Sequence, residues 1–122
     1  MRSMYLNLNE LTILYNGKHL KSRQTVSLAR SQGKRVNAQD ISNTRVSVNL
    51  FCNLLDRANV QPKTIVNKAS KYYQNNLRGT DFSDEEWFYI LMNNPDLLVD
   101  PIIVYKQSAV VCKTPTDVLR VF

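Results

Sequence analysis

The stretch LTILYNGKHLKSRQTVSLARSQG, residues 11–33, decides the fold because it joins a strand to a helix through one short turn. LTILY (11–15) has the length and apolar content of a buried strand, and YNGKH (15–19) has the composition of a turn. From Leu20 to Gln32 the residues favour a helix, which Gly33 is suited to end. The stretch therefore predicts a strand, a turn and a helix in this order.

A second strand is predicted directly after this helix. RVNAQDI (35–41) alternates apolar and polar residues and ends on an apolar one. A strand, a helix and a strand in this order pair in parallel, with the helix as the crossover. The chain therefore opens as a βαβ unit, which predicts an α/β fold.

The middle of the chain is predicted to be a helical insert. SVNLFCNLLDRAN places Val48, Phe51, Cys52, Leu55 and Ala58 on one apolar stripe at helical spacing. The proline in QPKTI can begin another helix, and helix-favouring residues continue through KASKYYQNNL.

The next helix carries the clearest start signal. Ser83 and Glu86 have the spacing of a capping box, and Phe82 and Trp87 that of a hydrophobic staple. The helix is expected to stop at Pro95.

Two more strands, joined as a hairpin, are predicted at PIIVY (101–105) and AVVCK (109–113). A last helix is predicted at TPTDVLRVF, in which Val118, Leu119 and Phe122 can pack. Together with the strands near 11–15 and 35–41, they give a mixed four-stranded sheet with flanking helices. The predicted core residues are Leu14, Val26, Phe51, Leu55, Trp87, Ile90, Leu91, Ile103 and Val111.

Length and composition indicate one domain over residues 1–122, with 43% apolar residues. No apolar run reaches the length of a membrane span, and the first residues do not resemble a secretion signal. Cys52 and Cys112 lie far apart in sequence without a CxxC or a partner histidine, which favours reduced thiols over a disulfide or a metal site. We therefore expect a cytoplasmic protein without membrane partners, metal or cofactor.

The net charge of +6 is unevenly distributed. Residues 1–80 carry 13 basic and 3 acidic side chains, whereas residues 81–122 carry 3 basic and 7 acidic ones. A basic segment such as residues 1–80 can bind nucleic acid, an acidic protein or a small oxyanion. Since no basic–aromatic interleaving or helix-turn-helix pattern accompanies it, we do not expect nucleic-acid binding.

Two stretches of the chain resemble the ArsC family of arsenate reductases and their relative Spx, which share a thioredoxin-like fold. LTILYNGKHLKSRQTVSLARSQG resembles the family's opening, where a strand ends in the turn Asn-Pro-x-Cys-x-x-Ser-Arg. DFSDEEWFYILMNNPDLLVDPIIVYKQSAVVCKTPTDVLRVF (81–122) resembles its C-terminal half, with a helix ending in Asn-Pro, an x-Pro-Ile-x-Val strand and a closing Pro-x-x-Val-Leu helix.

The resemblance also shows where this chain departs from the family. The position of the nucleophilic cysteine falls on His19, and Gly17 replaces the usual proline. The arginine before the family's proline falls on Asp100, whereas the arginine before the last helix falls on Lys113, which keeps the positive charge. Pro101 then falls where thioredoxin-like proteins often hold a cis proline that shapes the cleft.

An arsenate reductase needs a thiolate, which an imidazole cannot replace in the redox cycle. No orienting carboxylate is evident near His19 in the sequence, which favours a polar turn residue over a nucleophile. A weak oxyanion site at the turn is still expected, because a helix N-terminus and cations converge there. Its candidate residues are Asn16, Lys18, Lys21, Ser22, Arg23 and Lys113.

Two functional hypotheses follow. The first is an ArsC-like protein with a degenerate redox site that acts as a binding or regulatory protein, as Spx does, although the CxxC of Spx is absent here. The alternative is a glutaredoxin- or glutathione-linked arsenate reductase or other thiol oxidoreductase that uses Cys112, whose neighbour Lys113 can lower its pKa. Cys52, on the apolar stripe, is expected to be packing.

Overall fold

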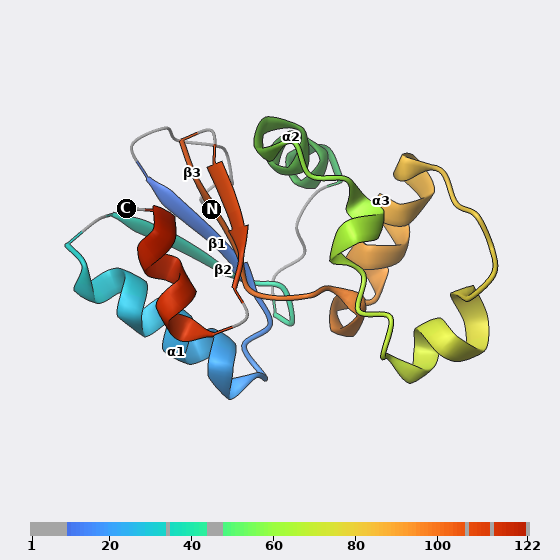
Figure 1. Ribbon diagram of the computed structural model, residues 1–122, viewed down its shortest axis with the longest axis horizontal. Helices are drawn as coiled ribbons and strands as arrows, with labels where there is room; N and C mark the ends of the chain where they lie inside the picture. The colour runs from blue at the N-terminus through green and yellow to red at the C-terminus, as the bar shows by residue number, and fades with distance from the viewer. Residues whose placement is uncertain (1–9, 34, 44–47, 107, 113, 122) are drawn as a thin grey trace.

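The centre of the molecule is a four-stranded sheet in the order β2–β1–β3–β4 (Figure 1). β1 (Leu11–Tyr15) pairs in parallel with β2 (Val36–Asp40) and antiparallel with β3 (Ile102–Tyr105), which pairs antiparallel with β4 (Ser108–Val111). This mixed sheet confirms the predicted fold class. The computed structural model describes residues 10–33, 35–43, 48–106, 108–112 and 114–121.

One face of the sheet is covered by α1 (Leu20–Ser31) and η4 (Pro115–Val121), which pack against each other (Figure 1). Gly33, just beyond α1, has a φ of +77°, a conformation that glycine adopts without strain and that suits a helix end. The apolar cluster on this face contains Leu11, Ile13, Val26, Ala29, Ile103, Cys112 and Val118.

The helical insert follows β2 and extends to one side of the sheet, in green to orange in Figure 1. Its α2 contacts both α3 and β4. The apolar cluster here joins insert residues such as Phe51, Leu55 and Leu91 to Leu14, Ile102 and Val104 of the sheet. The insert consists of α2 (Val48–Ala58), η1 (Pro62–Ile65), the π-helical η2 (Tyr73–Leu77), α3 (Asp84–Asn93) and η3 (Pro95–Leu97).

The two clusters share the central strands because successive side chains of a strand point to opposite faces. In β1, Ile13 belongs to one cluster and Leu14 to the other. In β3, Ile103 lies between Ile102 and Val104, which face the insert. A sheet buried on both faces has strands that are apolar throughout, which is why LTILY and IIVY show no alternation.

The predicted start of α3 is confirmed. The Ser83 hydroxyl accepts a hydrogen bond from the Glu86 backbone N–H at 3.2 Å, and the Glu86 carboxylate accepts one from the Ser83 N–H at 2.9 Å. The Phe82 and Trp87 rings meet edge to face, with their centroids 4.9 Å apart. The helix ends at Asn93, just before Pro95.

The structure differs from the predictions at several apolar positions. The last helix is a 3-10 helix, in which adjacent side chains diverge by a third of a turn. Val118 is therefore buried while Leu119 is 43% exposed, so the prediction that Leu119 packs was wrong. Ile90 and Val111 lie at the edge of the insert cluster and are only partly buried. Phe122 lies outside the described residues.

Within the described ranges, no helix combines the length and the apolar character that crossing a membrane requires.

Candidate functional site

The turn between β1 and α1 spans residues 16–19 and closes on itself through Asn16, which is fully buried. The Asn16 side-chain oxygen accepts a hydrogen bond from the Lys18 N–H at 3.0 Å, and its backbone oxygen accepts one from the His19 N–H at 3.0 Å. The Asn16 amide group donates to Asp96 at 3.0 Å, which ties the turn to η3. Asparagine is suited to this place because its short side chain can mimic a backbone turn.

Asp40, the last residue of β2, approaches the turn from the neighbouring strand. Its carboxylate accepts a hydrogen bond from the Gly17 N–H at 2.8 Å and others from the N–H and hydroxyl of Ser42. Burial raises the pKa of Asp40, but the Ser42 and Gly17 hydrogen bonds and the Lys18 charge together hold it below its ordinary value. Asp40 is therefore a carboxylate at neutral pH.

Replacing Gly17 with alanine is expected to destabilise the protein. A Cβ atom at this position would lie 2.0 Å from a carboxylate oxygen of Asp40, so the carboxylate would have to leave its hydrogen bonds. We expect a loss of about 1–3 kcal/mol in the free energy of unfolding, typical of overpacking. Urea unfolding of the Gly17→Ala variant measures it.

Asp40→Ala provides the matched test, because it removes the carboxylate that the new methyl group would meet. The double variant should lose less stability than the sum of the two single variants. Strictly additive losses would contradict a clash at this position.

Asp100 reaches the same turn from the loop before β3. Its carboxylate is 4% exposed and accepts hydrogen bonds from the Asn16 N–H at 2.9 Å and from the Ser22 hydroxyl. Its other oxygen lies 2.9 Å from Nδ1 of His19. The peptide bond between Asp100 and Pro101 is cis. The turn thus surrounds a buried carboxylate with three donors.

The contact between His19 and Asp100 was missed by the sequence analysis, which found no orienting carboxylate near the histidine. The two residues lie 81 positions apart, so no local pattern links them. The family resemblance could have indicated this contact, because it places His19 at the nucleophile position and Asp100 at a position of the oxyanion clamp. The structure corrects that point: His19 has a carboxylate partner.

The predicted cations lie around the turn in different roles. The guanidinium of Arg23 donates to the Gly17 carbonyl at 2.7 Å and so holds the turn rather than facing a ligand. Lys18 and Lys21 are exposed, and Lys113 lies outside the described residues. His19 precedes α1 without a side-chain cap bond to it. The first-turn N–H groups of α1 thus lack a side-chain cap, and the weak anion site there stays a prediction.

Cys112 is fully buried under α1 and η4, in the cluster that these helices form with the sheet. Burial and, to a smaller extent, the Asp117 charge raise the pKa of Cys112 to about 11, and the charges of Arg120 and Lys21 only partly oppose this shift. Cys52 is partly buried and its pKa is also raised, chiefly by burial. Neither thiol has the lowered pKa of a reactive cysteine.

Folded protein is expected to react very slowly with iodoacetamide at Cys112. A pKa near 11 instead of 9.0 leaves about a hundredfold less thiolate at pH 8, and burial hinders access further. The Cys52→Ser variant isolates this thiol, and mass spectrometry follows its alkylation.

The same variant in urea is the control and should react rapidly. Since the unfolded thiol ionises at lower pH than the folded one, stability should also fall as the pH rises from about 9 towards 11. Equal alkylation rates in the folded and unfolded protein would contradict the burial of this thiol.

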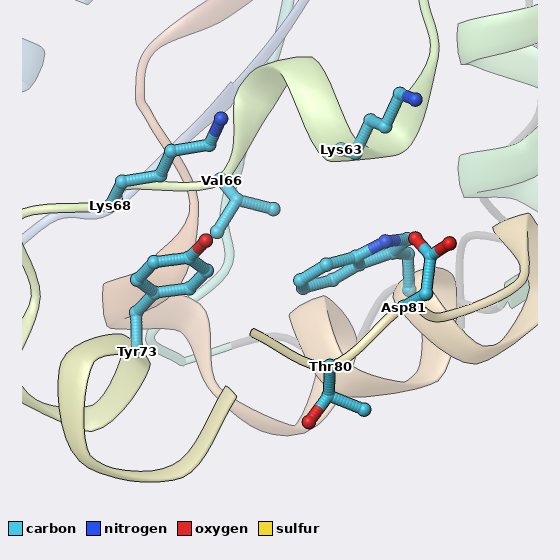
Figure 2. A pocket seen from close by; sticks show the side chains of 7 residues that line it. Lys63, Val66, Lys68, Tyr73, Thr80 and Asp81 are labelled. Atoms are coloured by element: carbon cyan, nitrogen blue, oxygen red, sulfur yellow. The ribbon is translucent and has the colours of Figure 1, made fainter. Parts of the chain in front are cut away.

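A separate small pocket lies in the helical insert and was not predicted. It holds about 150 Å³, and its walls include the rings of Tyr73 and Trp87. In Figure 2, Lys63 and Lys68 lie on one side of the pocket and Thr80 on the other. It shares no lining residue with the turn. No cluster of three or more metal-ligating side chains occurs in the part of the chain that the structure describes.

The fold and the turn together define a class of protein: a thioredoxin-like α/β domain of the arsenate reductase type. The model of the ArsC family matches residues 16–121, so the chain belongs to the ArsC family.

Solved structures agree with this assignment. An arsenate reductase from Vibrio cholerae is 25% identical, with a TM-score of 0.80 over 95% of this chain and 100% of that one. A candidate arsenate reductase from Yersinia pestis is also 25% identical, with a TM-score of 0.78 over 90% and 98% of the two chains. An ArsC-related protein from Brucella melitensis is 11% identical and shows the fold alone, with a TM-score of 0.65 over 88% and 90%. No curated protein matches the sequence.

Proposed function

We propose that this ArsC-family protein does not reduce arsenate and acts as a cytoplasmic binding or regulatory protein through its altered turn. The observation that carries the proposal is the hydrogen bond between His19 and the buried Asp100. By resemblance, these two positions hold the nucleophilic thiol and an arginine of the oxyanion clamp. Here an imidazole and a carboxylate stand in their place.

The chemistry of arsenate reduction needs a sulfur that bonds to arsenic and is then released by a second thiol. The turn contains no cysteine. Cys112 does not supply one, since it is fully buried and its raised pKa keeps it protonated at neutral pH. The alternative hypothesis of a Cys112-dependent oxidoreductase therefore receives no support from the geometry.

The electrostatics of the turn also oppose a tightly held oxyanion. The Asp100 carboxylate accepts from the Asn16 N–H and the Ser22 hydroxyl, donors that an anion in the turn could otherwise use. Two like charges about 4 Å apart repel by about 4 kcal/mol at an effective dielectric constant of 20. Weak binding at the outer cations, Lys18 and Lys21, is compatible with this arrangement, and a protein partner is the other expected ligand.

An arsenate reduction assay with glutathione and glutaredoxin tests the proposal. The Vibrio cholerae arsenate reductase serves as the positive control, and a Cys52→Ser/Cys112→Ser variant of this protein gives the thiol-free background. The wild-type protein should not exceed that background. Turnover that Cys112→Ser alone abolishes would overturn the proposal in favour of the thiol oxidoreductase.

A further inference from the structure

His19 is the single histidine of the chain, and its side chain is 47% exposed. The ring meets the buried Asp100 carboxylate through Nδ1. Because a carboxylate accepts hydrogen bonds, this contact suits the tautomer that carries its hydrogen on Nδ1, which leaves the lone pair on Nε2. Nε2 has no hydrogen-bond partner among the residues that the structure describes. The ring is thus held through Nδ1, and no described residue pairs with Nε2.

Asp100 is itself held firmly enough to orient the ring. Its second oxygen accepts from the Asn16 N–H and from the Ser22 hydroxyl, which belong to the turn and to α1. A histidine whose Nδ1–H is held by a buried carboxylate presents a defined tautomer, and the carboxylate offsets positive charge that develops on the ring. This is the arrangement that activates an imidazole for attack through Nε2.

An anionic group on Nε2 would be well placed electrostatically. His19 directly precedes α1, whose positive end carries no side-chain cap from it, and Lys18 and Lys21 are exposed neighbours in sequence. Nε2 lies across the ring from Asp100, so the imidazole separates an attached group from that carboxylate. A free oxyanion inside the turn has no such separation.

We infer that His19 accepts a phosphoryl group on Nε2 from a donor of the phosphoramidate class. The Nε2 lone pair forms the nitrogen–phosphorus bond, the bond from phosphorus to the donor's protonated nitrogen breaks, and this nitrogen leaves with the bonding electron pair as neutral ammonia. Nδ1 keeps its hydrogen and its bond to Asp100, so the product is a phosphorylated imidazolium paired with a carboxylate. The inference rests on the proposed function, since it makes residue 19 a regulatory site rather than part of a reductase.

Incubation of the full chain with potassium phosphoramidate tests the inference directly. Mass spectrometry should show the gain of one phosphoryl group, and phosphorus NMR should identify it as acid-labile phosphohistidine. Because the chain has one histidine, the site needs no further mapping. Folded protein should react at least about tenfold faster than the same protein in urea, where the contact with Asp100 is lost.

Three variants complete the experiment. The His19→Asn variant should gain no phosphoryl group. The Asp56→Asn variant, changed at an exposed position on α2, should react like the wild type. Asp100→Asn should slow phosphorylation by about tenfold or more, and nitrogen-15 NMR should show that the His19 ring of this variant no longer keeps a single tautomer.

A folded rate no higher than the rate in urea would overturn the inference, as would phosphorylation that persists in His19→Asn. An Asp100→Asn rate equal to the wild type would overturn the role of Asp100 as the positioning residue. None of these results depends on arsenate turnover, so failure of this inference and failure of the proposed function are distinguishable.

Discussion

The double variant His19→Cys/Asp100→Arg is expected to bind arsenate at least about a hundredfold more tightly than the wild-type protein. The change removes the buried Asp100 carboxylate that faces the turn and places a guanidinium there, which can hold an oxyanion through paired hydrogen bonds. It also restores a thiol at the start of α1, where the positive helix end lowers a thiol pKa. Isothermal titration calorimetry with arsenate measures the gain.

The single variants separate the two effects. Asp100→Arg alone should gain affinity without turnover, whereas His19→Cys alone should gain little of either, because the carboxylate that it leaves opposes the anion. Circular dichroism checks that each variant folds, which matters for a position as buried as Asp100. Arsenate reduction by His19→Cys at the rate of the double variant would show that Asp100 does not oppose the anion.

Replacing Phe51 with alanine is expected to lower the free energy of unfolding by about 3–5 kcal/mol, the usual cost for a buried phenylalanine. Phe51 is fully buried on α2, and its ring meets that of Phe88 on α3 edge to face, with centroids 5.6 Å apart. The substitution would leave a cavity at the centre of the insert cluster. Urea unfolding followed by circular dichroism measures the loss.

Tyr89→Ala is the matched control for this variant, since Tyr89 is an aromatic residue on α3 whose side chain is largely exposed, at 53%. The free energy of unfolding of this variant should change by no more than about 0.5 kcal/mol, as for most surface substitutions. Equal losses in the two variants would show that the insert cluster does not depend on the packing of Phe51.

The features that could be predicted from the sequence are those with a local physical cause. The capping box of Ser83 and Glu86 depends on a spacing of three residues, and the turn after LTILY depends on its own asparagine and glycine. The burial of Phe51 and Leu55 follows from a stripe on a single helix. These patterns act over a few residues, and all of them are found in the structure.

The features that could not be predicted depend on contacts between distant segments. Asp100 meets His19 only after the sheet and insert have brought the loop before β3 to the end of β1. The exposure of Leu119 depends on which side of the last helix packs against α1 and the sheet, which its apolar spacing does not determine. The residues of the candidate site were therefore visible in the sequence, but the contact between His19 and Asp100 was not.

The position of β1 in the sheet has a consequence for how the protein is made. β1 lies between β2 and β3, and its residue Thr12 pairs with Val104, which a ribosome adds roughly 90 residues later. Until then the nascent chain can pair β1 only with β2, and the other side of a strongly apolar strand stays open. Ribosome-bound intermediates of this chain thus expose one unpaired edge of β1 until β3 has been made, and such an edge is a natural binding site for chaperones.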